Sequence, residues 1–154
     1  MGERLTEQKR KVFEAKWEKI ASLLGPEWIM DYAEMEKYMP KPENTWDFTA
    51  ILSGPVFKIF AKSGPYSYPD HWRIFPAWPR DSRNLVNLPG EKRANPSSIN
   101  LRLEKTCEQI AQEIKDRALA PWSAFAAEIV LHNAKADDCR TGQYLSRRES
   151  EEGK

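Results

Sequence analysis

The sequence is poor in the residues and motifs that mark most enzymes and metalloproteins. Its 154 residues include only two cysteines and two histidines. Cys107 and Cys139 cannot form a disulfide framework, so we interpret both as free thiols in a reducing compartment. Zinc sites have paired ligands at short spacing, whereas these cysteines and histidines are scattered along the chain. With no glycine-rich phosphate loop, Gly-x-Ser-x-Gly or Cys-x-x-Cys motif either, we expect no enzyme, metal or cofactor.

Long apolar runs and a strong net charge are absent as well. No stretch approaches the roughly 18 to 20 apolar residues that a membrane span needs. The first ten residues lack the apolar core of a signal peptide. The formal net charge is +1, so no overall field attracts nucleic acid or a membrane surface. These absences predict a cytoplasmic protein without membrane contact, and they favour no particular oligomeric state.

The clearest pattern that is present is a switch from strand to helix periodicity between residues 95 and 119. Apolar and polar residues alternate from Ile99 to Glu104, which predicts a half-buried strand. Thr106 and Gln109 then form a capping-box signature. Apolar residues recur at helical spacing after it: Ile110, Ala111, Ile114, Ala118 and Leu119. A strand is therefore expected to turn directly into a helix, and each carries one apolar face.

Helices are expected at both ends of the chain. Residues 5–24 carry an apolar stripe that Gly25 ends, and Thr6 is expected to cap its start. Residues 26–38 predict a second, short helix. At the other end, Pro121 either starts a new helix or kinks a continuous one.

Three more strands are expected between the helices. Residues 46–52 and 56–62 are close enough in sequence to form an antiparallel hairpin. Residues 72–78 form the next strand, which Pro76 should place at an edge or end early.

Strands in a run with helices at both ends predict an α+β two-layer sandwich. We expect an antiparallel sheet of about four strands, with the N-terminal and C-terminal helices packed on one face. This single domain should span residues 1–134. Residues 135–154 hold five basic and five acidic residues with almost nothing apolar, so we expect a disordered tail.

The candidate binding region is the aromatic and basic stretch from residue 66 to 93. Interleaved aromatics and arginines can stack bases and contact phosphates, and they also dominate protein–protein interfaces. A third interpretation is that its tryptophans are core residues and its arginines solubilise a loop. The near-zero net charge favours a protein partner over nucleic acid. The candidate partner-binding residues are Tyr66, Tyr68, Arg73, Arg80, Arg83, Lys92 and Arg93, with Arg80 and Arg83 preferred for charge-assisted contacts.

Three short motifs carry a resemblance to a known family. They are His71-Trp72-Arg73-Ile74 with Trp78-Pro79, Ser98-Ile99-Asn100-Leu101, and Ile110-Ala111 with Ile114, Arg117, Pro121 and Trp122. Over roughly residues 45–132 the chain resembles small uncharacterised proteins of bacteriophages and other bacterial mobile elements. The resemblance implies a setting rather than an activity, because small non-enzymatic phage proteins often bind a host or defence component.

We therefore expect a non-enzymatic binding protein of mobile-element type. One such protein would be an anti-CRISPR-like inhibitor of a bacterial defence complex. The alternative is a nucleic-acid-binding domain that uses the 66–93 region.

Overall fold

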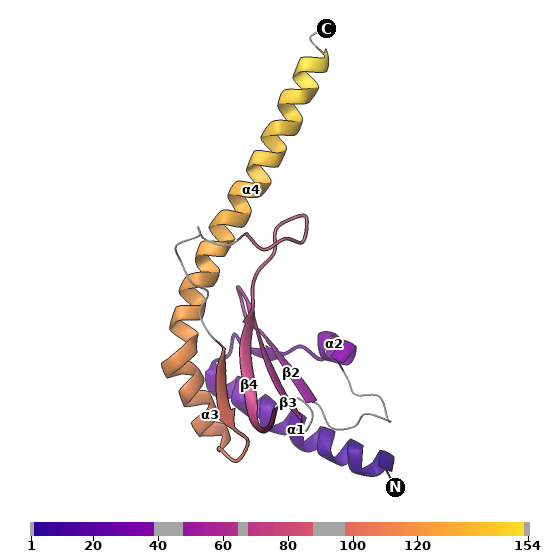
Figure 1. Cartoon of the computed structure of the whole chain (residues 1–154), viewed down its shortest axis with the longest axis vertical. Helices are drawn as coiled ribbons and strands as arrows, with labels where there is room; N and C mark the ends of the chain where they lie inside the picture. Colours follow the sequence, from indigo (N-terminus) through magenta and orange to yellow (C-terminus); the bar gives the residue numbers. More distant parts are fainter. Residues whose placement is uncertain (1, 39–47, 65–67, 88–97, 153–154) are drawn as a thin grey trace.

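The computed structural model describes residues 2–38, 48–64, 68–87 and 98–152, with side chains at 8–38, 49–63, 70–87 and 98–140 (Figure 1). It has an antiparallel sheet and helices, which confirms the predicted α+β class. The helical elements are α1 (Gly2–Leu24), α2 (Tyr32–Met35), η1 (Glu36–Tyr38), α3 (Cys107–Ile114), η2 (Lys115–Leu119) and α4 (Ala120–Glu152). The strands are β1 (Ile29–Met30), β2 (Phe48–Ser53), β3 (Lys58–Gly64), β4 (Tyr68–Ala77) and β5 (Ile99–Arg102).

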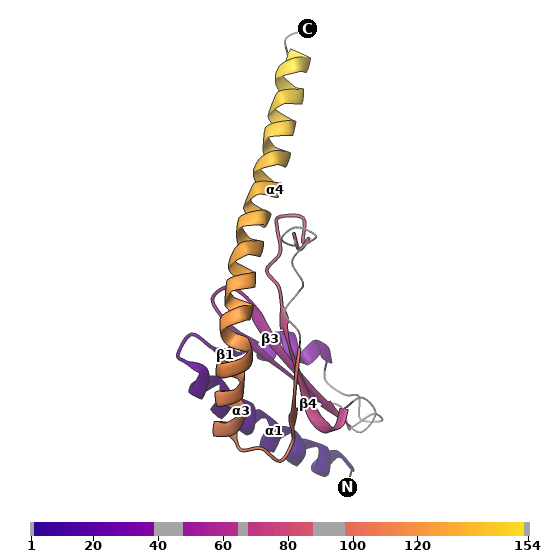
Figure 2. The ribbon, with the colours of Figure 1, turned by 60° about the vertical axis from the view of Figure 1, so that its left-hand side comes forward.

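The five strands lie in the sheet in the order in which they occur in the sequence, and each pair of neighbours is antiparallel. Because successive side chains of a strand point to opposite faces, the register assigns each residue to one face. The covered face is apolar and buried, and comprises Ala50, Leu52, Ile59, Ala61, Trp72, Ile74, Ile99 and Leu101. Helices α1 and α3 and the first part of α4 lie against this face (Figures 1 and 2).

Helix α1 packs on the covered face through the stripe that its sequence predicts. The ring centroids of Phe13 and Trp17 lie 5.7 and 5.1 Å from that of Trp72 on β4. Gly25 ends the helix with a φ of 142°, a conformation that favours glycine. The start differs from the prediction, because α1 begins at Gly2 and Thr6 lies within it rather than at its cap.

The C-terminal helices form one continuous rod. The predicted capping box is present: the Thr106 hydroxyl accepts from the Gln109 N–H at 3.1 Å, and the Gln109 side chain accepts from the Thr106 N–H at 2.9 Å. Between α3 and α4, η2 is a π-helical segment that ends just before Pro121. Proline has no N–H and its ring crowds the preceding turn, and a π-helical segment is one of the devices that relieve such crowding. Pro121 therefore starts no separate helix.

Two other segments differ from the sequence-based expectation. Residues 26–38 do not form one helix, because Ile29 pairs with Ser53 as an edge strand before Asp31 caps the single turn of α2. Strand β4 lies between β3 and β5 rather than at an edge. Its pairing with β5 ends at Ile74. Among the described strands, none pairs with Pro76 on the β5 side, so a residue without an N–H is tolerated there.

The expected tail is also arranged differently. Helix α4 continues past residue 134 to Glu152 and projects away from the sheet (Figure 1). Asp137 and Arg140 bond to a loop of the domain, so the disorder expected from residue 135 does not apply to this part. No helix among the described residues is long and apolar enough to cross a membrane.

Candidate functional site

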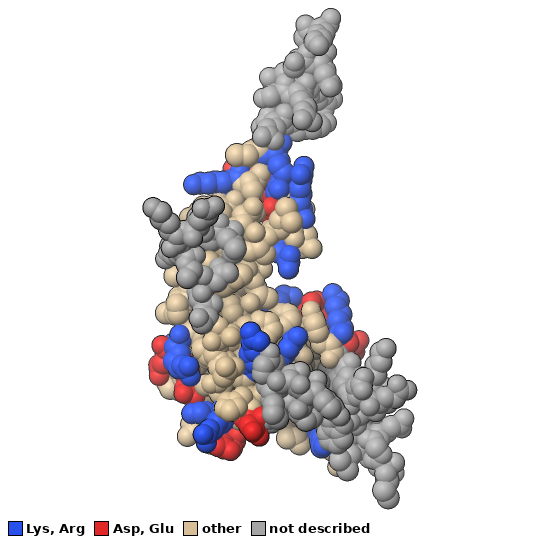
Figure 3. Space-filling view, in the orientation of Figure 1, with Lys and Arg blue, Asp and Glu red and all other residues tan. Residues whose placement is uncertain are grey.

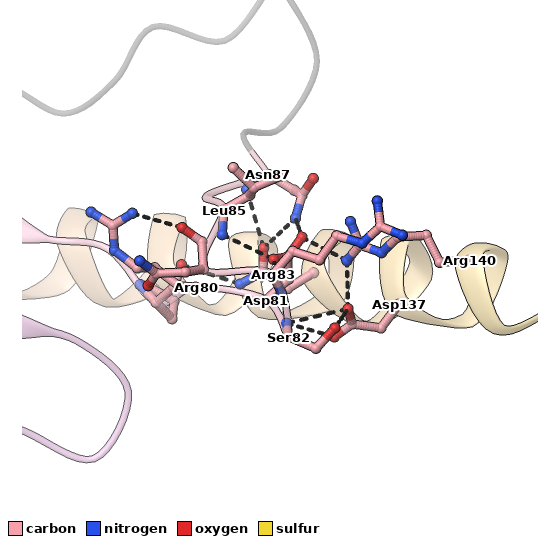
Figure 4. A network of polar contacts seen from close by, with 11 residues as sticks. Arg80, Asp81, Ser82, Arg83, Leu85, Asn87, Asp137 and Arg140 are labelled. Atoms are coloured by element: carbon pink, nitrogen blue, oxygen red, sulfur yellow. Dashed lines mark hydrogen bonds and ion pairs between the residues drawn. The ribbon is translucent and has the colours of Figure 1, made fainter.

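One group of charged side chains lies in the contact between residues 79–87 and α4 (Figure 4). We call this segment the 79–87 loop. Asn133, Asp137 and Arg140 are spaced by four and three residues, so they lie on one side of α4. All three bond to the loop. The loop is therefore fastened along two turns of the helix.

Asp81 is the centre of this contact, and its side chain is fully buried. One carboxylate oxygen accepts from the backbone N–H groups of Arg83 and Leu85, both at 2.9 Å. The other accepts from the Asn87 amide and from the Arg140 guanidinium, both at 2.8 Å. The bond from Arg140 is the main reason that the pKa of Asp81 lies far below its usual range, because these donors outweigh the opposing effect of burial.

A second carboxylate extends the network. Asp137 accepts from the Ser82 hydroxyl and from Arg140, both at 2.5 Å, and these two bonds, Ser82 first, lower its pKa. The Asn133 carbonyl oxygen accepts from the backbone N–H and the side-chain amide of Asn87 at 3.1 and 2.8 Å. Every acid in the network thus faces hydrogen-bond donors, as in a contact that holds structure together.

The sequence-predicted binding residues do not form one surface. Arg80 and Arg83 lie on the 79–87 loop, where Arg80 donates to the Asn84 carbonyl at 2.9 Å and Arg83 is exposed. Arg73 lies on β4, away from this loop. Tyr68 lies in the same strand, but its side chain is outside the described set. Tyr66, Lys92 and Arg93 lie outside the described residues.

A second group of charged side chains lies on the face of the sheet opposite the covered face, which we call the open sheet face. Among the described residues this face is accessible over β4 and β5, whereas Thr49, Ile51 and Phe60 on β2 and β3 are buried, with the Tyr38 ring of η1 against Phe60. Paired residues place its side chains in four rows across the strands: Ser53–Lys58–Ala77, Ile51–Phe60–Phe75, Thr49–Lys62–Arg73–Asn100 and His71–Arg102. Lys and Arg are the charged residues in these rows, and none of these positions holds Asp or Glu. Figure 3 shows Lys and Arg side chains over the strands, with most Asp and Glu toward the margins.

The cations of the open sheet face differ in how far they are neutralised. Lys58 pairs with Asp31 at 2.8 Å, and the hydrogen bond between them lowers the pKa of Asp31 and raises that of Lys58. Arg102 approaches Glu104 at 3.5 Å, with both side chains mostly exposed, so water screens this pair strongly. Arg73 is exposed and stands directly across from Lys62 in the register.

Aromatic rings lie beside these cations. Phe60 and Phe75 are cross-strand partners with ring centroids 5.5 Å apart, and the Tyr38 ring meets Phe60 edge-on at 5.7 Å. The Lys62 ammonium lies 5.4 Å from the Tyr38 centroid and 5.9 Å from that of Phe75. Tyr38 is 41% exposed and Phe75 is partly exposed. The open sheet face therefore combines accessible aromatic surface with positive charge.

The sequence analysis did not select Lys62, Phe75 or Arg102 as binding residues, although a signal for them was present. Lys58 and Lys62 alternate with Ile59 and Ala61, which already predicts a basic and an apolar face for that strand. What the pattern did not supply was the register that sets Lys62 beside Arg73 on the next strand.

Among the residues that the structure describes, no group of three or more His, Cys, Asp or Glu could hold a metal ion. An open hollow between α1 and β1 is lined by Trp28, Ile29 and Tyr32, among others. Its one polar pair is the Tyr32 hydroxyl, which donates to Glu18.

No protein-family model, no curated protein and no solved structure matches the chain.

Proposed function

We propose that this chain is a non-enzymatic binding protein that recognises an anionic partner through the open sheet face. The observation that carries the proposal is that the charged residues in its rows are all basic. The setting that we propose is the one implied by the sequence resemblance, a mobile element whose product acts on a host or defence component.

The register of the sheet supports a binding role for these cations. Lys62 and Arg73 are direct cross-strand partners, and like charges at such positions disfavour the sheet. Exposed cations contribute little to folding. A single anion bound between them would contact both cations, so the register supplies a two-point contact for an anionic partner.

The 79–87 loop supports a binding role less well. Its polar groups are used to hold it on α4, and Arg80 donates to the loop's own backbone. The preference for Arg80 and Arg83 as contact residues therefore moves to Lys62, Arg73 and Arg102.

A column of immobilised heparin, a polyanion, tests this surface. The variant Lys62→Ala/Arg73→Ala/Arg102→Ala removes three cations from the open sheet face. Its matched control, Lys11→Ala/Arg83→Ala/Lys115→Ala, removes three exposed cations from elsewhere, so that both proteins have the same net charge.

We expect wild type and control to elute at similar salt and the open-face variant to elute at much lower salt, because local charge density decides retention. Melting curves of the three proteins check that all are folded. Equal elution of the two variants would contradict the proposal, since retention would then depend on net charge alone.

A further inference from the structure

Resting on the proposed function, we propose that the anionic partner is a single-stranded nucleic acid that crosses β3, β4 and β5. In this arrangement a base stacks on Phe75 beside Tyr38, and the phosphates lie along Lys62, Arg73 and Arg102. The juxtaposition that carries the proposal is the accessible ring surface of Phe75 and Tyr38 next to a basic row on the same face of the sheet, while Phe60 lies buried beneath Tyr38.

The spacing of the rows suits a strand of this kind. Phe75 and Arg73 are two residues apart on β4, as are Phe60 and Lys62 on β3. Each row therefore lies about 7 Å from the next, at about 3.3 to 3.4 Å per residue. A base over the aromatic row can keep its own phosphate over the basic row. Proteins that bind single strands combine these two elements, a positive track and aromatic rings.

Lys62 is placed to serve both rows. Its ammonium now lies between the Tyr38 and Phe75 rings, where a cation is attracted to the ring faces. A base that enters between the rings would take this place, and the flexible lysine stem can turn the ammonium toward the phosphate. The position of the ammonium, 5.4 Å from the Tyr38 centroid and 5.9 Å from that of Phe75, is therefore the place that we assign to the base.

The same features disfavour other anionic partners. A duplex keeps its bases stacked, so it could use the cations but not Phe75. An acidic protein surface would use the cations and needs no ring stacking. The exposed side chains of His71 and Asn100, next to the cations, offer donors and acceptors for the edges of unpaired bases.

Fluorescence anisotropy with a labelled thymidine oligonucleotide of about twelve residues tests the inference, a length within the usual site sizes. The ring-removing variants are Phe75→Leu and Tyr38→Leu, the ring-keeping variant is Phe75→Tyr, and the control is Arg83→Ala. The same oligonucleotide annealed to its complement gives the duplex comparison. Melting curves verify folding, and Tyr38, which is 41% exposed, provides a second ring whose removal is tested independently of Phe75.

We expect the single strand to bind more tightly than the duplex, with an affinity that falls steeply as salt rises. Phe75→Leu and Tyr38→Leu should each weaken binding by about five- to a hundredfold, the range for loss of one stacked base. Phe75→Tyr and Arg83→Ala should bind as wild type does. Neither leucine variant should change retention on heparin.

The inference is overturned if the wild type does not bind the single strand, or if both leucine variants bind it unchanged. In that case the heparin experiment still tests whether the open sheet face binds an anion at all. If the open-face variant still loses retention, the partner is a different anion. If it does not, the proposed function falls as well.

Discussion

The 79–87 loop and the open sheet face are both rich in charge, but they use it in opposite ways. On the loop, Asp81 is buried and each of its oxygens accepts two hydrogen bonds. On the open sheet face, Lys62 and Arg73 are placed side by side with no acid in their rows. On the loop a buried acid is bonded to donors of the same chain, whereas the charged residues in the rows of the open sheet face are all basic.

In a chain with a net charge of only +1, a locally basic surface can still exist, and the two regions show how. The overall charge is small because acids and bases cancel in contacts such as that of Asp81 with Arg140. What remains on one face of the sheet is locally basic. The near-zero net charge, which favoured a protein partner over nucleic acid in the sequence analysis, averages over these two unlike regions.

The largest expected effect on stability is that of Asp81→Ala. The change leaves the N–H groups of Arg83 and Leu85 without their acceptor and Arg140 without its principal partner, and unmade buried hydrogen bonds are costly. We expect a clear fall in melting temperature with unchanged heparin retention. The control is Asp138→Ala, which removes an exposed acid from α4. If both variants melted like wild type, the network would not hold the loop.

Truncation of α4 separates the network from the rest of the helix. A chain that ends after residue 136 loses Asp137 and Arg140, whereas one that ends after residue 146 keeps both. We expect the shorter chain to melt at a lower temperature and the longer one to melt close to wild type. Equal melting of the two truncated chains would show that these bonds add nothing and that the domain ends near residue 134.

The dependence of the melting temperature on acid pH tests the carboxylates that hold the 79–87 loop. Asp81 and Asp137 have lowered pKa values in the folded state, so their stabilisation is complete above the unfolded value of about 3.9 and is lost as pH falls through the folded values. The melting temperature of wild type should exceed that of Asp81→Asn by a constant amount above about pH 5. The gap should narrow on further acidification. If the difference in melting temperature between wild type and Asp81→Asn widened in acid, the pKa of Asp81 would not be lowered by folding.

The open-face variant Lys62→Ala/Arg73→Ala/Arg102→Ala should have the smallest effect on stability. Each substitution removes an exposed or half-exposed cation, which typically changes the free energy of unfolding by less than about 0.5 kcal/mol. Its acid titration should run close to that of wild type, because the pair that it removes between Arg102 and Glu104 is exposed and screened by water. A large loss of stability would identify these cations as structural.

Local patterns predicted the parts of the fold that depend on neighbouring residues. The capping box at Thr106, the stripe of α1 and the alternation of β5 are each set within a few residues. The segment 26–38 was assigned as one helix because its apolar spacing is helical, whereas pairing of Ile29 with Ser53 decides its actual form. Tertiary pairing overrode local propensity there.

The network and the open sheet face depend on contacts that composition does not reveal. Arg140 was read as part of a polar tail because its partner, Asp81, is 59 residues earlier in the chain. The alternation of Lys58 and Lys62 predicted a basic strand face, but only the register places Arg73 and Arg102 in the rows beside it. Sequence thus predicted the faces of single strands, and the surface they form together required the structure.

The most direct test of the central claim is an amide NMR titration of the whole chain with a short heparin oligosaccharide. The account predicts the largest shift changes at residues of the open sheet face, above all Lys62, Arg73 and Arg102. Amides of the 79–87 loop should change little, because their bonds to Asp81 and α4 stay intact. Shifts centred on Arg80, Arg83 and the facing part of α4, with an unperturbed sheet, would contradict it.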